Sequence, residues 1–244
     1  MTRPADPRRG DESLDAFYHG RVRVLQRKKG YRFSVDAPLL ADFVRPRPED
    51  EALEIGTGSG VVALLVAVRP VRRITALEVQ PGLADLARRN VALNGLERRI
   101  EVVEADLRTW APDRRFDLVF SNPPYLRGGT GSLARSAERA AARHELHGGI
   151  GDVLGRAAAW LDPAGRAAFV YPERRRADFA RAADRAGFRV LRFRQVRPRA
   201  GEPPNLFLAE LGFAAVHPEI MPPLVLFGPD GRYTPEAEAV FAGP

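Results

Sequence analysis

The chain has 244 residues, of which 45% are hydrophobic, and this is enough to bury the core of one full α/β domain. Its formal net charge is +7, almost entirely from arginine, so the charge alone is weak evidence for a polyanionic partner. The lack of cysteine and the four scattered histidines predict no disulfide and no metal site, and the lack of a long apolar run or signal core predicts a cytoplasmic protein with no membrane contact.

The N-terminal quarter of the chain contains only short predicted elements. Residues 1–15 are charged and contain proline, so we expect them to be disordered, and we expect residues 16–244 to form a single domain. A strand is predicted at 21–25 and a turn at 28–30. Ser34-Val35-Asp36 resembles a cap that opens a helix through Phe43.

From residue 52 onward, predicted strands alternate with predicted helices. The strands are expected at 53–55, 73–78, 100–106, 116–121, 165–170, 188–196 and 205–213, and the helices at 61–68, 81–93, 153–161 and 174–186. This alternation predicts an α/β fold with a Rossmann-like, doubly wound sheet of seven strands and helices on both faces. We expect the sheet to be mostly parallel, with an antiparallel last pair, and to bind its ligand at the carboxyl ends of the strands.

A glycine-rich loop follows the first of these strands. It contains Glu54, Gly56, Thr57, Gly58 and Gly60 and leads directly into an apolar helix. Glycine permits positive φ angles and close approach of a ligand to the backbone. The glycine spacing is tighter than in the dinucleotide fingerprint, and no Lys-Ser/Thr pair follows, which excludes a P-loop. A nucleoside ligand without a pyrophosphate fits this loop better.

Acidic residues end the next two strands. Glu78 lies where such folds hold the two ribose hydroxyls, and Asp106 is placed to accept a hydrogen bond from the amino group of an adenine. Val79 and Leu107 follow these acids and are counted with them as cofactor-binding residues. Together with the glycine loop, they make S-adenosylmethionine the leading cofactor, with S-adenosylhomocysteine as its product.

The tetrapeptide Asn122-Pro123-Pro124-Tyr125 follows the strand at 116–121. The Asn side-chain oxygen and the Pro123 carbonyl are two acceptors on a stiff turn, and the tyrosine offers a ring for stacking. Two fixed acceptors can hold a planar NH2 group and direct its nitrogen lone pair. We therefore predict that these four residues are catalytic, that Asn122 also borders the cofactor, and that the reaction is methyl transfer to nitrogen.

Basic residues cluster on both sides of this predicted core. These basic residues lie close to the predicted pocket for the target base. This position favours contact with RNA over a surface that is only solvated. The predicted substrate-binding residues are Lys28, Lys29, Arg32, Arg135, Arg139 and Arg143.

These motifs resemble those of class I S-adenosylmethionine-dependent methyltransferases, and within them the bacterial valine-tRNA adenine-37 N6-methyltransferases. The resemblance covers roughly residues 17 to 240; segments 30–40 and 228–234 are similar to flanks particular to that family, although Pro38 departs from its usual pattern. The resemblance implies that Tyr125 stacks on an unpaired adenine in an anticodon loop of tRNA while Asn122 and the Pro123 carbonyl accept from N6.

Several alternatives remain open. A glutamine amide would satisfy the same two acceptors, as in the protein-glutamine N5-methyltransferases of release factors, although those carry a larger N-terminal domain. A small-RNA guanine N2-methyltransferase and a non-catalytic RNA-binding module with a vestigial cofactor fold are further possibilities. No obligate protein partner is evident.

Overall fold

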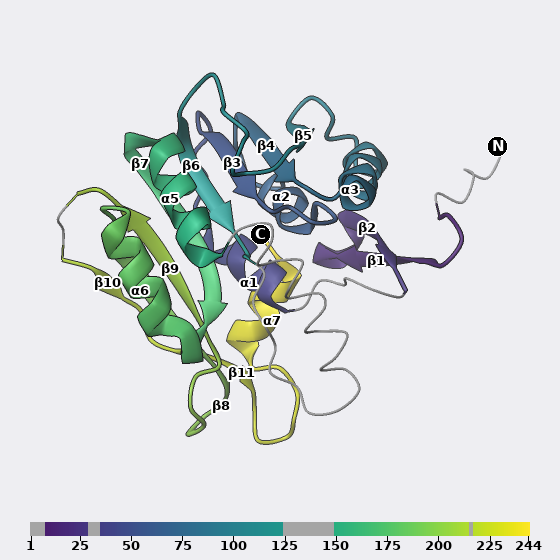
Figure 1. Ribbon diagram of the computed structural model, residues 1–244. Coiled ribbons are helices and arrows are strands. Elements are labelled where there is room, and N and C mark those ends of the chain that lie inside the picture. The colour runs from purple at the N-terminus through teal and green to yellow at the C-terminus, as the bar shows by residue number, and fades with distance from the viewer. Residues whose placement is uncertain (1–7, 29–34, 124–148, 215–216) are drawn as a thin grey trace, which may run out of the picture.

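The computed structural model describes residues 8–28, 35–123, 149–214 and 217–244. Its centre is a twisted sheet in the order β5-β4-β3-β6-β7-β9-β8 (Figure 1). These strands are β3 (Glu51–Ile55), β4 (Arg73–Glu78), β5 (Ile100–Glu104), β6 (Phe116–Ser121), β7 (Leu161–Pro172), β8 (Arg189–Arg199) and β9 (Leu206–Gly212). The predicted doubly wound sheet is confirmed. Since strand order reverses between β3 and β6, their carboxyl ends form the crevice where such sheets bind ligands.

All pairs among β5, β4, β3, β6 and β7 are parallel, whereas β9 is antiparallel to both β7 and β8. The predicted antiparallel last pair is therefore correct. Two short strands that were not predicted, β10 (Glu219–Ile220) and β11 (Leu224–Phe227), pair with β8 and extend the sheet to nine strands. They are too short to show a sequence period of their own.

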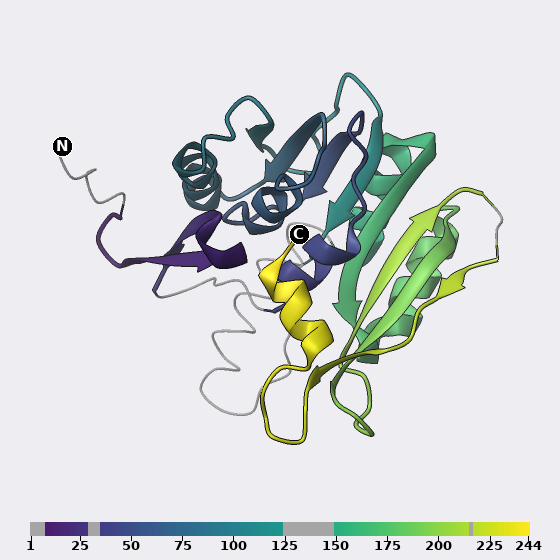
Figure 2. The ribbon, with the colours of Figure 1, turned by 180° about the vertical axis from the view of Figure 1, so that it is seen from behind.

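Helices cover both faces of the sheet (Figures 1 and 2). One apolar cluster joins the sheet to α1 (Asp36–Phe43), α2 (Val61–Val66), α3 (Pro81–Leu93) and α7 (Pro235–Ala242). A second cluster, on the opposite face, joins it to α5 (Ile150–Trp160) and α6 (Arg176–Arg185). Short 3-10 turns lie at Tyr18–Gly20 and Glu173–Arg175. In the described ranges, no helix is both long and apolar enough to cross a membrane.

The N-terminal segment departs from the prediction. Strand β1 (Glu12–Phe17) pairs antiparallel with β2 (Val22–Arg27), so the expectation that residues up to 15 are disordered is wrong from Glu12 onward. Arg89 of α3 donates two hydrogen bonds to the Glu12 carboxylate, at 2.6 and 2.7 Å. This ion pair and the ladder with β2 order a segment whose composition is polar. Residues 1–7 lie outside the described residues.

Local chemistry explains the helix boundaries. Helix α3 begins with Pro81, and Gly95 follows its end with φ of 65°. In α1, Pro38 lies in the first turn, where a backbone N–H has no partner within the helix and its loss costs nothing. The proline that departs from the family pattern is thus compatible with the helix.

Candidate functional site

The glycine loop joins the carboxyl end of β3 to α2. Gly56, Gly58 and Gly60 have φ angles of 73°, 60° and 85°, values that strain residues with a side chain. The amides of Gly56 and Thr57 both donate to the Leu77 carbonyl of β4 at 2.9 Å. The loop is therefore fixed to the neighbouring strand by its backbone, and Gly56 is exposed.

The side chain of Glu54 supports this loop through hydrogen bonds. Its side chain is 1% exposed, and Oε2 accepts hydrogen bonds from the Thr57 hydroxyl at 2.5 Å and from the Ala63 amide at 3.1 Å. Burial raises the pKa of Glu54 to about 8, and the nearby Glu78 carboxylate adds to the effect. Glu54 thus determines the shape of the loop, and its direct contact with a cofactor stays a prediction.

Glu78 ends β4 with its carboxylate against the same loop. One oxygen accepts from the Gly58 amide and the other from the Gln80 amide, both at 2.8 Å. The side chain is 5% exposed, and Val79 beside it is half-buried. One carboxylate, that of Glu78, therefore binds both the glycine loop and the start of α3. It is the carboxylate that the sequence predicts to bind the ribose hydroxyls.

Asp106 lies just beyond the end of β5, where its side chain is 21% exposed. Arg108 donates to both carboxylate oxygens, with the shortest contact, from Nη2, at 2.6 Å. Leu107 is half-buried and packs against the second apolar cluster. If the amino group of an adenine donated a hydrogen bond to Asp106, this carboxylate would accept hydrogen bonds from both the adenine and Arg108.

Asn122 follows β6 and is half-buried, and Pro123 is buried. The hydroxyl of Ser121 donates to the Ile55 carbonyl at 2.7 Å, which ties the end of β6 to the start of the glycine loop. Phe120 of β6 pairs with Glu54 of β3, so Asn122, two residues later, is level with Gly56 at the start of the glycine loop. The structure brings the predicted methyl-acceptor and cofactor motifs together.

The remaining predicted residues are only partly covered by the structure. Lys28 is exposed at the end of β2. The other predicted site residues lie outside the described residues: Pro124, Tyr125, Lys29, Arg32, Arg135, Arg139 and Arg143.

The chain is similar in sequence to known enzymes. Residues 32–151 match the family model described as the methyltransferase small domain. A Vibrio cholerae protein named tRNA1(Val) (adenine(37)-N6)-methyltransferase is 33% identical over 183 residues, covering 75% of each chain. A Porphyromonas gingivalis protein of the same name is 30% identical over 237 residues, covering 91% of each. This chain belongs to that family of class I methyltransferases.

Solved structures support the family fold. A predicted O-methyltransferase from Agrobacterium tumefaciens matches with a TM-score of 0.67 and 24% identity, over 84% of this chain and 94% of that one. Trm5 from Methanocaldococcus jannaschii, solved in complex with adenosine, matches with a TM-score of 0.59 and 14% identity, over 85% of this chain and 57% of that one. At these identities the likeness concerns the fold alone.

As a member of this methyltransferase family, the protein uses S-adenosylmethionine, and its residues fit that cofactor. The carboxylates of Glu78 and Asp106 are acceptors suited to ribose hydroxyls and an adenine amine, and half-buried Val79 and Leu107 suit the faces of the ring. Among the described residues, no group of His, Asp or Glu is placed to hold a metal ion.

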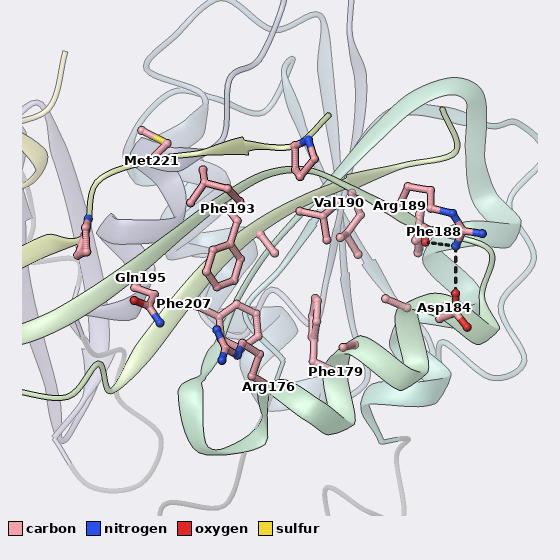
Figure 3. A pocket seen from close by; sticks show the side chains of 17 residues that line it. Arg176, Phe179, Asp184, Phe188, Arg189, Val190, Phe193, Gln195, Phe207 and Met221 are labelled. Atoms are coloured by element: carbon pink, nitrogen blue, oxygen red, sulfur yellow. Dashed lines mark hydrogen bonds and ion pairs between the residues drawn. The ribbon is translucent and has the colours of Figure 1, made fainter. Parts of the chain in front are cut away.

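A separate groove lies away from the methyltransferase crevice. It has a volume of about 720 Å³ and lies between α6, β8 and the segment around β10 (Figure 3). Its floor is apolar, with Phe179, Phe193 and Phe207 inside and charged side chains at its two ends, such as Arg176 and Arg189. None of the predicted site residues that the structure describes lines it.

Sequence reasoning missed one residue that supports the site. Asn90 of α3 is fully buried; its side chain accepts from the Leu25 amide at 2.7 Å and donates to the Leu25 carbonyl at 3.0 Å and the Ser59 carbonyl at 2.9 Å. It therefore joins the N-terminal hairpin to the glycine loop. The available signal was a lone amide on the apolar face of α3, three residues after Ala87.

Proposed function

We propose that this protein methylates N6 of adenine 37 in the anticodon loop of a tRNA, acting in the cytoplasm as one methyltransferase domain that includes β1 from Glu12 onward. The observation that carries the proposal is the position of Asn122, at the carboxyl end of β6 and beside the glycine loop across the β3–β6 pair. The names of its relatives, at 30–33% identity, support adenine in tRNA as the acceptor.

The roles of the residues follow from their chemistry. S-adenosylmethionine, when bound, supplies an electrophilic methyl group on a positively charged sulfur. The Asn122 side-chain oxygen and the Pro123 carbonyl accept from the two N6–H groups and draw the nitrogen lone pair away from the ring. Tyr125 stacks on the base, and a target base in a loop is cheap to splay out because it is already unpaired.

Catalysis in this scheme depends on orientation and on placement of charge. No strong base is needed, because the amino nitrogen becomes acidic once it is methylated and can release its proton to water. Glu78 and Glu54 hold the glycine loop, through Gly58 and Thr57, in the shape that a bound cofactor requires. Preorganised acceptors of this kind typically account for a large share of an enzyme's rate enhancement.

The test is mass spectrometry of nucleosides from unmodified tRNA incubated with the protein and S-adenosylmethionine. We expect N6-methyladenosine, and its loss when nucleotide 37 is changed from adenine to guanine. N2-methylguanosine as the product would favour the guanine alternative. Methylation of a release-factor glutamine without methylation of tRNA would favour the protein alternative. Binding of tRNA without turnover under all conditions would indicate a vestigial enzyme.

A further inference from the structure

The strand register shows that β7 extends this edge of the sheet well beyond Asn122. Ser121 at the end of β6 pairs with Phe169 of β7, but β7 continues three residues further, to Pro172. At about 3.3 Å per residue, β7 projects roughly 10 Å past the end of β6. Pro172 pairs with Leu206, and Leu206 pairs with Val196 of β8, so these three residues form one row across β7, β9 and β8.

Arginines follow this row directly. Arg174 is two residues beyond Pro172, and Arg197 and Arg199 are one and three residues beyond Val196. We call these three residues the arginine rim. With neighbouring strands about 4.8 Å apart, the row spans roughly 10 Å from β7 to β8. The β8–β9 loop lies at the end of the molecule toward which the β6 arrow points (Figure 1).

The rim arginines are weakly neutralised, in contrast to their neighbours. Within the described part of the chain, Arg174 is exposed and its side chain has no ion pair or hydrogen bond. Arg197 is half-buried, and its Nε is buried with no hydrogen-bond partner. Arg199 makes one contact, to Glu202 at 3.3 Å, between side chains that are 55% and 43% exposed, and such a surface pair is weak in water.

Nearby arginines, by comparison, are held by protein groups. Arg176 pairs with Glu173 at 3.2 Å and lies at one end of the apolar groove, near Gln195 (Figure 3). Arg194, whose guanidinium is bound by Glu236 and the Pro222 carbonyl, is 8% exposed. At this end of the sheet, the positive charge that can be offered to a partner therefore lies on the rim arginines and not on Arg176 or Arg194.

We propose that the arginine rim binds backbone phosphates of the RNA whose target base enters the site at Asn122. This rests on the proposed function, which supplies an RNA substrate. Guanidinium groups bind phosphate oxygens in a bidentate manner, and the rim lies on the same edge of the sheet as the target turn. Phosphates flanking the target nucleotide would thereby be aligned along β7 and β8.

The test compares two triple variants with equal loss of charge. The rim variant is R174Q/R197Q/R199Q. The control variant is R47Q/R98Q/R185Q, which changes three exposed arginines with no side-chain partner in the described residues, near the amino ends of β3, β5 and β8. Glutamine keeps most of the side-chain stem and so limits damage to packing. The probe is a fluorescent tRNA anticodon stem-loop, titrated by anisotropy between 50 and 250 mM KCl.

We expect the rim variant to bind this RNA roughly 10- to 100-fold more weakly at low salt, with a log–log salt slope about 2 to 3 units shallower. The control variant should keep the wild-type slope. Both variants should bind S-adenosylhomocysteine with wild-type affinity, and the rim variant should lose activity through KM for RNA rather than through kcat.

Three results would overturn the proposal. If the rim variant keeps the wild-type slope while the wild type methylates tRNA, the rim is excluded and the proposed function stands. If the control variant weakens RNA binding as much as the rim variant, the effect is one of net charge. If the wild type ignores tRNA and the rim instead binds an acidic protein substrate, the proposed function fails as well.

Discussion

Replacing Glu54 by glutamine tests whether the carboxyl beneath the glycine loop is protonated. In the folded protein, burial raises its pKa from 4.5 to about 8, against the lowering effect of hydrogen bonds from Thr57 and Ala63. At neutral pH the folded state therefore carries Glu54 mainly in its neutral form. Glutamine is nearly isosteric with that neutral form, and its side-chain oxygen can accept the same two hydrogen bonds from Thr57 and Ala63, but it cannot ionise.

The direction of the pH effect follows from proton binding. Between about pH 4.5 and 8 the folded state holds a proton on Glu54 that the unfolded state has lost, so the contribution of this group to stability falls as pH rises. At 1.36 kcal/mol per pKa unit, the loss amounts to roughly 3 to 5 kcal/mol by pH 9. Below pH 4.5 both states are protonated and the contribution is constant.

We expect E54Q to unfold with nearly the wild-type free energy at pH 5 and to be more stable than the wild type at pH 9. The measurement is urea denaturation of both proteins at pH 5, 7 and 9 without cofactor. The matched control is Glu104→Gln at the end of β5, where the carboxylate is 39% exposed and pairs with Arg88 at 3.3 Å. A stability difference between E54Q and wild type that does not change with pH would refute a protonated Glu54.

Three further substitutions test the rest of the site. Glu78→Ala removes the acceptor for the Gly58 and Gln80 amides and the predicted ribose clamp, so S-adenosylhomocysteine should bind on the order of 10- to 100-fold more weakly by calorimetry; unchanged affinity would exclude the clamp. Asn122→Ala should keep cofactor affinity and lower single-turnover methylation by about 100-fold or more, whereas wild-type turnover would contradict its role. Asn90→Ala breaks three buried hydrogen bonds, so urea denaturation should show a loss of roughly 2 to 4 kcal/mol, and a loss under 0.5 kcal/mol would show that water replaces them.

The sequence by itself determined the local elements and the chemistry of the motifs. The strands Arg73–Glu78 and Phe116–Ser121 and the helix Pro81–Leu93 match their predicted bounds, because hydrophobic period and end signals are local properties. The glycine loop and the turn at Asn122 were also readable, since positive φ and stiff acceptors depend on residue type. The predicted fold class followed from the alternation of these elements.

Only the tertiary structure decided which residues meet. Strand order places β6 beside β3 and so brings Asn122 to the glycine loop, although more than sixty residues separate them. The pairs Glu12–Arg89 and Asn90–Leu25 join distant segments, and the first of them orders a strand that composition alone predicted to be disordered. The tertiary structure also shows that buried Glu54 supports the glycine loop through Thr57 and Ala63, which its residue type alone did not indicate. Such contacts depend on register and packing across the sheet, and no local pattern in the sequence encodes them.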